Sequence, residues 1–260
     1  MNLFIAPFVN ALFGLYYMVG NLGWAIILIT ILIRLLLLPL VFPSLKSANR
    51  MRDLQPKINK LKEKYGNQKE ALAKAQMELY KQEGINPVAG CLPNILQIAV
   101  LIIFFQAFNV VSQFSEGKGS FEDINKLLVA PYQISQDFKF DLMFFGSNLT
   151  QTPAKLFDGG VVAQMILPFI LLVGSGLLQY WSAKLMMPAP AVDKNVVKVT
   201  KNKEDDMMSM MRTQSTYLMP LMTIFLGWSF NLGMLLYWFV NSLVMIGQQL
   251  ITNKLTVNSK

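Results

Sequence analysis

The chain of 260 residues contains no histidine and a single cysteine, Cys91. These absences exclude a disulfide within the chain and any metal site built from several Cys and His side chains. The sequence also shows no Gly-rich phosphate loop, and its serines have no base beside them in a catalytic pattern. It therefore predicts a protein that is not an enzyme and that has no cofactor and no metal.

Charged side chains are scarce as well. They make up 15% of the residues, and hydrophobic side chains make up 53%. An average soluble domain has about 25% charged residues. Five apolar stretches approach or reach the roughly 20 residues that a helix needs to cross the hydrocarbon core. We therefore expect an all-α membrane protein with transmembrane helices at residues 22–43, 91–112, 161–183, 215–230 and 232–251.

The segments between these stretches predict the topology. Residues 44–90, 184–214 and 252–260 hold ten, six and two Lys or Arg residues, whereas residues 113–160 hold four, against six acidic residues. Lys and Arg mark the cytoplasmic side of a membrane protein. We expect an outside N-terminus, an extracytoplasmic loop at 113–160 and a cytoplasmic tail at 252–260. The net charge of +8 suits anionic lipid headgroups or ribosomal RNA.

The N-terminal segment, residues 1–21, carries no charged side chain, and its apolar residues recur at helical spacing. This pattern predicts an amphipathic helix in the extracytoplasmic interface, with an extension of the first span as the alternative.

Residues 44–90 predict a cytoplasmic helical hairpin. Apolar residues recur every three or four positions from Met51 to Tyr65, Pro56 interrupts that run, and Gly66 is a natural helix stop. A second helix is expected to end at Gly84. The hairpin is either a solvated spacer between two spans or a mobile basic lid that meets incoming polypeptide or a targeting factor.

Arg34 is the most informative residue, because it lies near the middle of the first apolar stretch. A charge at this depth costs about 2.5–3.5 kcal/mol on insertion scales. About 15 Å of helix separates it from either interface, too far for easy snorkelling. None of the apolar stretches contains an Asp or Glu that could pair with it. We therefore expect the guanidinium to face a hydrated, positively charged recess.

Other polar residues lie deep in the apolar stretches, namely Thr30, Gln97 and Asn241. Two explanations are open. The side chains either share one hydrated cavity with Arg34 or make hydrogen bonds between helices.

Several short motifs follow one another along the chain. They are Gly23-Trp24 leading into Thr30 to Pro39, Leu54-Gln55-Pro56-Lys57, Asn86 to Pro93 with Cys91, Met219-Pro220, Leu236-Tyr237-Trp238 and Gln248-Gln249. In this order they resemble the YidC/Oxa1/Alb3 family of membrane protein insertases, in its short bacterial form.

The resemblance implies a five-helix core in the bacterial inner membrane, with a groove open to the cytoplasm and to lipid but closed outside. Thr30 and Tyr237 would line the substrate path with Arg34, and we expect Gln97 and Asn241 in the same groove. The implied function is insertion and chaperoning of nascent membrane proteins, alone or with the Sec translocon. Candidate partners are nascent membrane proteins, that translocon, the ribosome, signal recognition machinery and anionic lipid, but not DNA.

Two other functions stay open. One is a small transporter or channel that uses Arg34 as an anion site, although five spans without an internal repeat argue against it. The other is a structural subunit that packs against a translocon, with Arg34 tethering a lipid phosphate.

Overall fold

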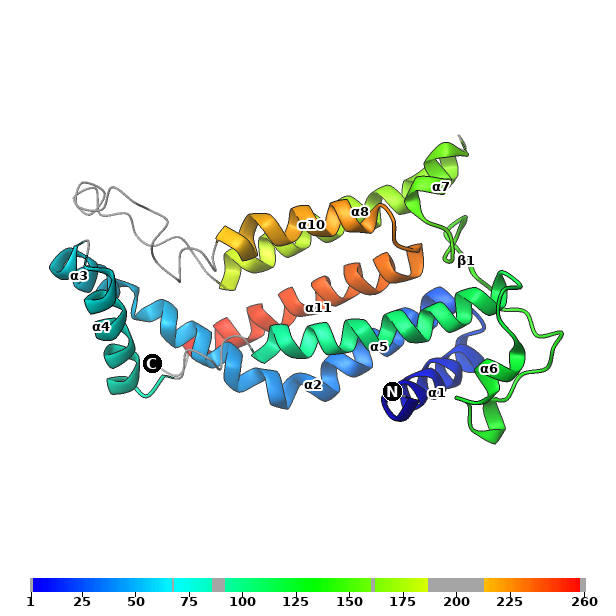
Figure 1. The fold of residues 1–260 in the computed structure, drawn as a ribbon, viewed down its shortest axis with the longest axis horizontal. Helices are drawn as coiled ribbons and strands as arrows, with labels where there is room; N and C mark the ends of the chain where they lie inside the picture. The colour runs from blue at the N-terminus through cyan, green and yellow to red at the C-terminus, as the bar shows by residue number, and fades with distance from the viewer. Residues whose placement is uncertain (1, 67, 86–91, 160–161, 187–212, 258–260) are drawn as a thin grey trace. The chain divides into compact units, whose positions relative to one another are not determined.

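The structure is a computed structural model, and it describes residues 2–66, 68–85, 92–159, 162–186 and 213–257 (Figure 1). The chain divides into two compact units. The first comprises Met1–Leu36, Ile95–Leu178 and Leu221–Val244, and the second comprises Leu37–Asn94, Gln179–Pro220 and Met245–Lys260. The motif from Asn86 to Cys91 and residues 187–212 of the predicted cytoplasmic loop lie outside the described residues.

Within the described ranges, four helices are long and apolar enough to cross a membrane. This confirms a helical membrane protein. They coincide with four of the five predicted spans, although the first continues through Pro39 and Pro43 to Asp53 and so exceeds the predicted 22–43. The four helices are α2 (Leu22–Asp53), α5 (Leu92–Ser115), α8 (Val162–Met186) and α11 (Leu232–Val257).

The predicted span 215–230 is shorter in the structure. A five-residue π-helical turn, η4 (Gln214–Leu218), leads into the nine-residue helix α10 (Met219–Gly227). After Gly227 the chain turns, with Phe230 N donating to the Gly227 carbonyl, and α11 begins at Leu232. Together η4 and α10 fall short of the roughly 20 residues of a full crossing.

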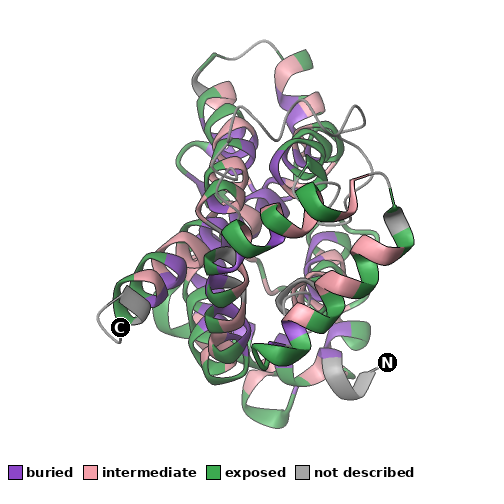
Figure 2. Ribbon diagram, turned by 90° about the vertical axis from the view of Figure 1, so that its left-hand side faces the viewer, coloured by how far each residue is buried: buried purple, intermediate pink, exposed green. Residues whose placement is uncertain are grey.

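The core of the first unit is apolar and includes the N-terminal helix, α1 (Asn2–Val19). Val9 and Phe13 of α1 are buried in the same cluster as Ile26 of α2, Phe104 of α5 and Leu235 of α11. Figure 2 shows buried and exposed residues on different faces of the individual helices, as expected for helices that pack on one side. The predicted location of α1 at a membrane interface stays a prediction.

The segment 113–160 of the first unit folds into short elements. Ser120 caps α6 (Phe121–Asn125) by accepting a bond from Asp123 N, as its position before the helix favours. A two-stranded antiparallel hairpin follows, in which Met143 pairs with Asn148 and Phe144 with Ser147. The other elements are η2 (Ala130–Tyr132), β1 (Met143–Phe144), β2 (Ser147–Asn148) and α7 (Pro153–Asp158).

The second unit contains a helical hairpin of α3 (Gln55–Tyr65) and α4 (Lys69–Gln82), which pack against each other. Pro56 stands in the first turn of α3, where proline is tolerated, and Gly66 ends the helix with a positive φ of 53°. A small cluster of Leu54, Ile58, Tyr80 and Ile85 holds the hairpin. Lys57 of α3 pairs with Glu83, which directly follows α4.

Candidate functional site

Arg34 of α2 is held by amide oxygens from two other helices of the first unit. Its Nε donates to Asn241 Oδ1 of α11 at 2.6 Å, and its Nη2 donates to Gln97 Oε1 of α5 at 2.5 Å. The residue is only 8% exposed. Hydrogen bonds from a charged donor are short and strong, so these contacts fix the guanidinium between three helices.

Gln97 extends this network to Tyr237 of α11. Its Nε2 donates to the Tyr237 hydroxyl oxygen at 3.1 Å. The tyrosine is buried, and its ring stacks on Phe104, with ring centroids 4.4 Å apart and an interplanar angle of 16°. Gln97 thus accepts from Arg34 with its oxygen and donates to Tyr237 with its nitrogen. We call Arg34, Gln97, Tyr237 and Asn241 the Arg34 cluster.

The spacing along α11 explains why two members of the cluster come from one helix. Tyr237 and Asn241 are four residues apart, and such residues share one helix face. That face points into the first unit, because Tyr237 and Asn241 are both buried. Amides and hydroxyls at such a place need partners, and the Arg34 cluster supplies them.

The four residues of the Arg34 cluster together carry one positive charge and no negative charge. Gln97 and Asn241 are neutral, so their bonds satisfy N–H donors without cancelling the positive charge. No Asp or Glu occurs in the four candidate spans. A carboxylate brought to about 4 Å would gain roughly 4 kcal/mol at an effective dielectric constant of about 20. The arrangement can therefore bind anionic or strongly polar groups.

Thr30 lies one turn before Arg34 but bonds elsewhere. Its Oγ1 donates to the Ile26 carbonyl of the same helix at 2.6 Å, and the residue is buried. Among the contacts of the described residues, no hydrogen bond links Thr30 to the Arg34 cluster. Of the two explanations that the sequence left open, hydrogen bonding between helices describes the bonds of Gln97 and Asn241 in this conformation, and the hydrated recess stays a prediction.

One end of the first unit is closed by residues 141–152, which we call the loop cap. Leu22 N, at the start of α2, donates to the Asp141 carbonyl at 3.0 Å. The Nδ2 of Asn21 donates to Asp141 Oδ2 at 2.9 Å and to the Met143 carbonyl at 2.8 Å. Asp141 N in turn donates to the Tyr16 hydroxyl of α1 at 2.9 Å. The loop cap is therefore bonded to both α1 and α2.

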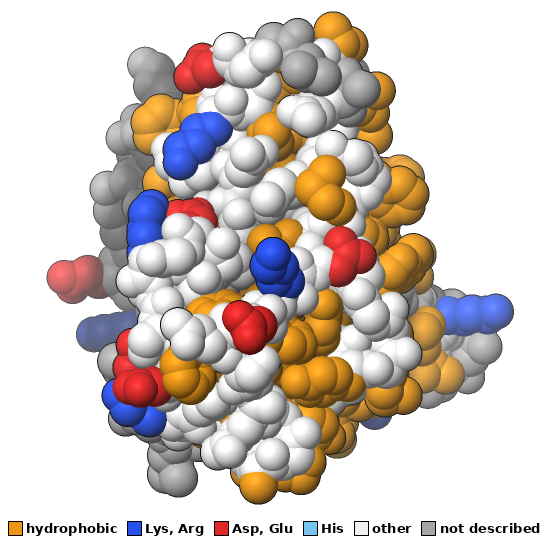
Figure 3. Space-filling model, turned by 90° about the vertical axis from the view of Figure 1, so that its right-hand side faces the viewer, with side chains coloured by type: hydrophobic (Ala, Val, Ile, Leu, Met, Phe, Trp, Pro, Cys, Tyr) orange, Lys and Arg blue, Asp and Glu red, His pale blue; other side chains and the backbone are white. Residues whose placement is uncertain are grey.

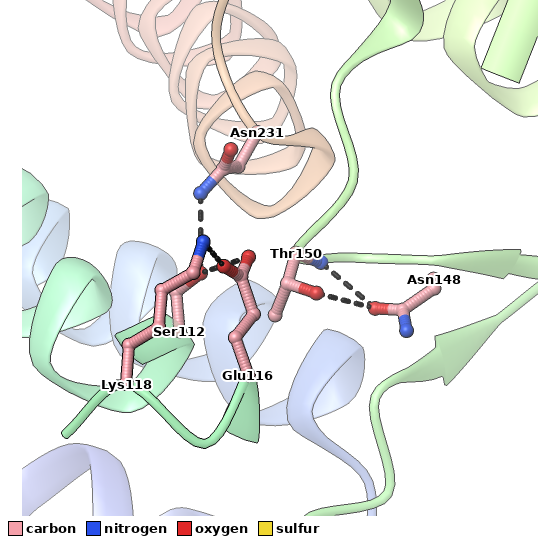
Figure 4. A network of polar contacts seen from close by, with 6 residues as sticks. All are labelled: Ser112, Glu116, Lys118, Asn148, Thr150 and Asn231. Carbon is pink, nitrogen blue, oxygen red and sulfur yellow. Dashed lines mark hydrogen bonds and ion pairs between the residues drawn. The ribbon is translucent and has the colours of Figure 1, made fainter. Parts of the chain in front are cut away.

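The loop cap also holds the start of α11. Leu232 N donates to the Gln151 carbonyl at 2.8 Å, and Gly233 N donates to the Leu149 carbonyl at 2.9 Å. The first N–H groups of a helix have no partner within it, and the loop cap provides one for each of these two. Nearby, Asn231 Nδ2 donates to Ser112 Oγ at 3.4 Å (Figure 4).

Charged side chains at this end are few and of both signs. Ser112 Oγ also contacts Glu116, which pairs with Lys118 at 2.7 Å (Figure 4). In Figure 3 the Lys, Arg, Asp and Glu side chains of this face lie among apolar and uncharged atoms, and some lie beside a side chain of opposite charge. The hydrogen bond and charge of Lys118 hold the pKa of the Glu116 carboxyl below its ordinary value.

Two glycines let aromatic rings lie against the helix starts. A Cβ on Gly23 would come within 2.2 Å of the Phe144 ring, and a Cβ on Gly233 within 2.2 Å of the Phe108 ring. The sequence patterns did not predict the loop cap or these close contacts. The available signal was glycine at the second residue of two apolar helices.

Comparison with known proteins decides the family. A family profile described as "60Kd inner membrane protein" matches residues 14–260. The chain is 33% identical, over 246 residues and 94% of its length, to a Dinoroseobacter shibae protein named "Membrane protein insertase YidC". The chain belongs to the YidC family.

Other members of the YidC family agree. Identity is 34% over 252 residues, or 95% of the chain, for a Helicobacter pylori protein of the same name. It is 39% over 175 residues, or 65% of the chain, for one from Legionella pneumophila. The chain spans 35%, 35% and 31% of these three relatives. These matches confirm the resemblance found in the motifs, and with it a multi-pass membrane protein of an inner-membrane family that is not an enzyme.

Proposed function

We propose that the chain is a membrane protein insertase whose Arg34 cluster receives a short hydrophilic segment of a nascent membrane protein. The observation that carries this proposal is a buried guanidinium held by neutral amide oxygens of Gln97 and Asn241. Such oxygens stabilise the charge until a stronger acceptor arrives. A carboxylate is that stronger acceptor, because its bond to a guanidinium is assisted by charge on both sides.

The exchange proposed at the site is a replacement of partners. An incoming carboxylate or backbone carbonyl takes one of the Arg34 donors, and the released amide of Gln97 or Asn241 pairs with the backbone of the segment. Each amide has both a donor and an acceptor, so few polar groups lose a partner. We further propose that water enters this groove with the segment, and that Thr30 lines the same path.

Release of the following apolar helix into lipid supplies the driving force. Each buried CH₂ group contributes about 0.8 kcal/mol. The membrane potential adds about 2.3 kcal/mol per 100 mV for each acidic charge moved outward. We propose that these contributions suffice for insertion without a nucleotide.

The topology proposed for this function has five crossings, an N-terminus outside and a cytoplasmic C-terminus. Residues 214–227 would make the short fourth crossing, which a bilayer accommodates at a modest cost. The lysine-rich hairpin of α3 and α4 would then face the cytoplasm, where it can meet the ribosome, signal recognition machinery, the Sec translocon or anionic lipid.

Photocrosslinking to a stalled nascent chain tests this function. A photoreactive residue at Gln97 should form adducts with a substrate whose translocated segment carries one acidic residue, and positions 30 and 237 should do so too. Ile98 is the matched control, because it is the next residue of α5 and is exposed on a different face. Adducts of equal yield at 97 and 98 would contradict a substrate path through the cluster.

The charge itself is tested by two substitutions. We expect Arg34→Lys to retain more insertion activity than Arg34→Glu in proteoliposomes, because both the native residue and lysine keep a positive charge. Equal activity of the two variants would rule out an electrostatic role. Anion flux in the same liposomes, without insertion, would favour a transporter instead.

A further inference from the structure

The turn between β1 and β2 carries a strained aromatic residue. Phe145 has a φ of 44° and is the single non-glycine residue with a positive φ in the described part of the chain, and Gly146 follows with a φ of 79°. A two-residue turn with both φ values positive normally favours Asn-Gly. A phenylalanine there is unfavourable for the backbone. Phe145 is also 72% exposed, so its ring gains little packing within the chain.

The hairpin that presents Phe145 is itself firmly held. Phe144 is buried against Gly23, and its ring meets Trp24 edge-on with centroids 5.6 Å apart. The Phe145 ring lies 4.7 Å from that of Phe144 at an interplanar angle of 80°. The amide of Asn21 also bonds the Met143 carbonyl. The exposed ring is therefore fixed to the first turn of α2.

Three exposed apolar side chains belong to this hairpin and to the first turn of α2. Trp24 and Met143 are each 50% exposed, and Phe145 is more so. Trp24 belongs to the first turn of a helix that qualifies as a membrane span from Leu22 onward. The first turn of a span lies where hydrocarbon meets headgroups, and this layer accommodates aromatic rings. The three side chains thus continue the lipid-facing surface of α2.

We infer that Trp24, Met143 and Phe145 form a lipid anchor that inserts between headgroups and acyl chains at this end of α2. Lipid is favoured over a protein partner because the three side chains are continuous with a membrane span. The anchor holds the loop cap against the bilayer surface. Transfer of the Phe145 ring into lipid offsets the strain of its turn.

Spin labelling in vesicles of phosphatidylethanolamine and phosphatidylglycerol tests the anchor. The label is placed by Phe145→Cys after Cys91, the single native cysteine, is replaced by serine. We expect collisions with oxygen to be favoured over collisions with a water-soluble nickel complex by severalfold more than at a control label, Gln136→Cys. Gln136 is an exposed residue of the same loop segment. Equal accessibility at the two positions would overturn the inference.

A second pair of variants distinguishes the contact of the Phe145 ring with lipid from the backbone strain of its turn. Phe145→Asn keeps a residue that tolerates positive φ but removes the ring, whereas Phe145→Trp keeps an aromatic ring. With the label moved to Met143→Cys, we expect Phe145→Asn to shift the label toward the nickel complex by severalfold and Phe145→Trp to leave it unchanged. An unchanged label in Phe145→Asn would contradict the anchor.

Discussion

Two regions of the first unit contrast in how they are bonded. The loop cap is tied to α2 and α11 largely through backbone groups, as in the bonds of Leu22 to Asp141 and Gly233 to Leu149. The bonds that join Arg34, Gln97, Tyr237 and Asn241 to one another run between side chains. Side-chain partners can exchange by rotamer changes, whereas backbone partners exchange only when the chain itself moves. The unit thus combines a fixed end with a site whose contacts can be replaced.

The largest effect is expected from a larger side chain at the start of α11, where the loop cap is bonded. Gly233→Ala places a Cβ where the Phe108 ring lies, 2.2 Å away, and this ring is fully buried. Overpacking of this kind costs about 1–3 kcal/mol. We expect a loss of that size in the free energy of unfolding, measured by chemical denaturation in detergent.

Gly247→Ala is the matched control on the same helix, because a Cβ there meets nothing within 4 Å. Alanine is favoured over glycine in a helix by about 0.5–1 kcal/mol, so this variant should be slightly stabilised. Equal effects of the two substitutions would show that the contact with Phe108 does not matter.

A smaller effect is expected at the exchangeable site. Asn241→Leu removes the acceptor of Arg34 Nε and should cost about 1–2 kcal/mol, in the upper part of the range for polar contacts between membrane helices. Arg34→Met leaves the Gln97 and Asn241 oxygens without their donor but also removes a buried charge, whose desolvation is costly, so we expect a smaller loss of stability than for Asn241→Leu.

Insertion activity should rank these two variants in the opposite order. Arg34→Met is expected to lose most of its activity, whereas Asn241→Leu keeps the charge and should retain more. Parallel measurements of unfolding in detergent and of insertion in proteoliposomes compare the two properties. If both properties fell together in both variants, the cluster would be a structural feature only.

The hydrogen bonds of Asn21 are expected to contribute less to stability than the bond between Arg34 and Asn241. Its Oδ1 accepts from Gly23 N at 3.0 Å, which caps α2, while its Nδ2 bonds the loop cap. Asn21→Ala should cost about 1 kcal/mol. Asn21→Ser keeps a capping oxygen but loses both bonds to the loop cap, so the difference between the two variants separates capping from closure. A serine variant as unstable as the alanine variant would assign the whole effect to closure.

The smallest expected effect on stability is the pH dependence that the Glu116 carboxyl contributes. Lys118 lowers the pKa of this carboxyl from its ordinary value of 4.5. A folded pKa below the unfolded one means that the stabilisation is present above about pH 4.5 and is lost as the pH falls through the folded value. Because the pair is exposed, we expect only a few tenths of a kcal/mol. Thermal unfolding of Glu116→Gln should show a correspondingly weaker pH dependence in the acidic range, and an unchanged one would contradict this assignment.

Sequence signals predicted the elements that depend on local chemistry. Apolar length indicated α2, α5, α8 and α11, and Pro56 and Gly66 each marked a helix boundary. Length and composition did not give the exact bounds of the short span predicted at 215–230. Residues 215–230 are as apolar as the other spans, but their helix ends at Gly227, where Leu172 and Leu235 occupy the space that a side chain would need.

The sequence indicated which residues of the candidate site lie deep in the membrane, but not which of them bond to one another. The position of Arg34 in its apolar stretch indicated a charge at membrane depth, and Gln97 and Asn241 were evident as deep polar residues, whereas the hydrated recess expected around Arg34 stays a prediction. Which of them bonds which depends on how the helices rotate about their axes, and apolar stretches with weak periodicity do not fix that rotation. Thr30 illustrates this, because its hydroxyl bonds its own helix.

The hydrogen bonds of residues 141–152 to α1, α2 and α11 have a consequence for cleavage of the backbone elsewhere in this chain. The exposed turn around Gly117 lies between α5 and the loop cap, and neither Gly117 nor its neighbour Lys118 bonds α1, α2 or α11 among the described contacts. A proteolytic nick there would leave every bond from the loop cap to those helices intact. Two fragments divided at this turn and coexpressed are therefore expected to reassemble.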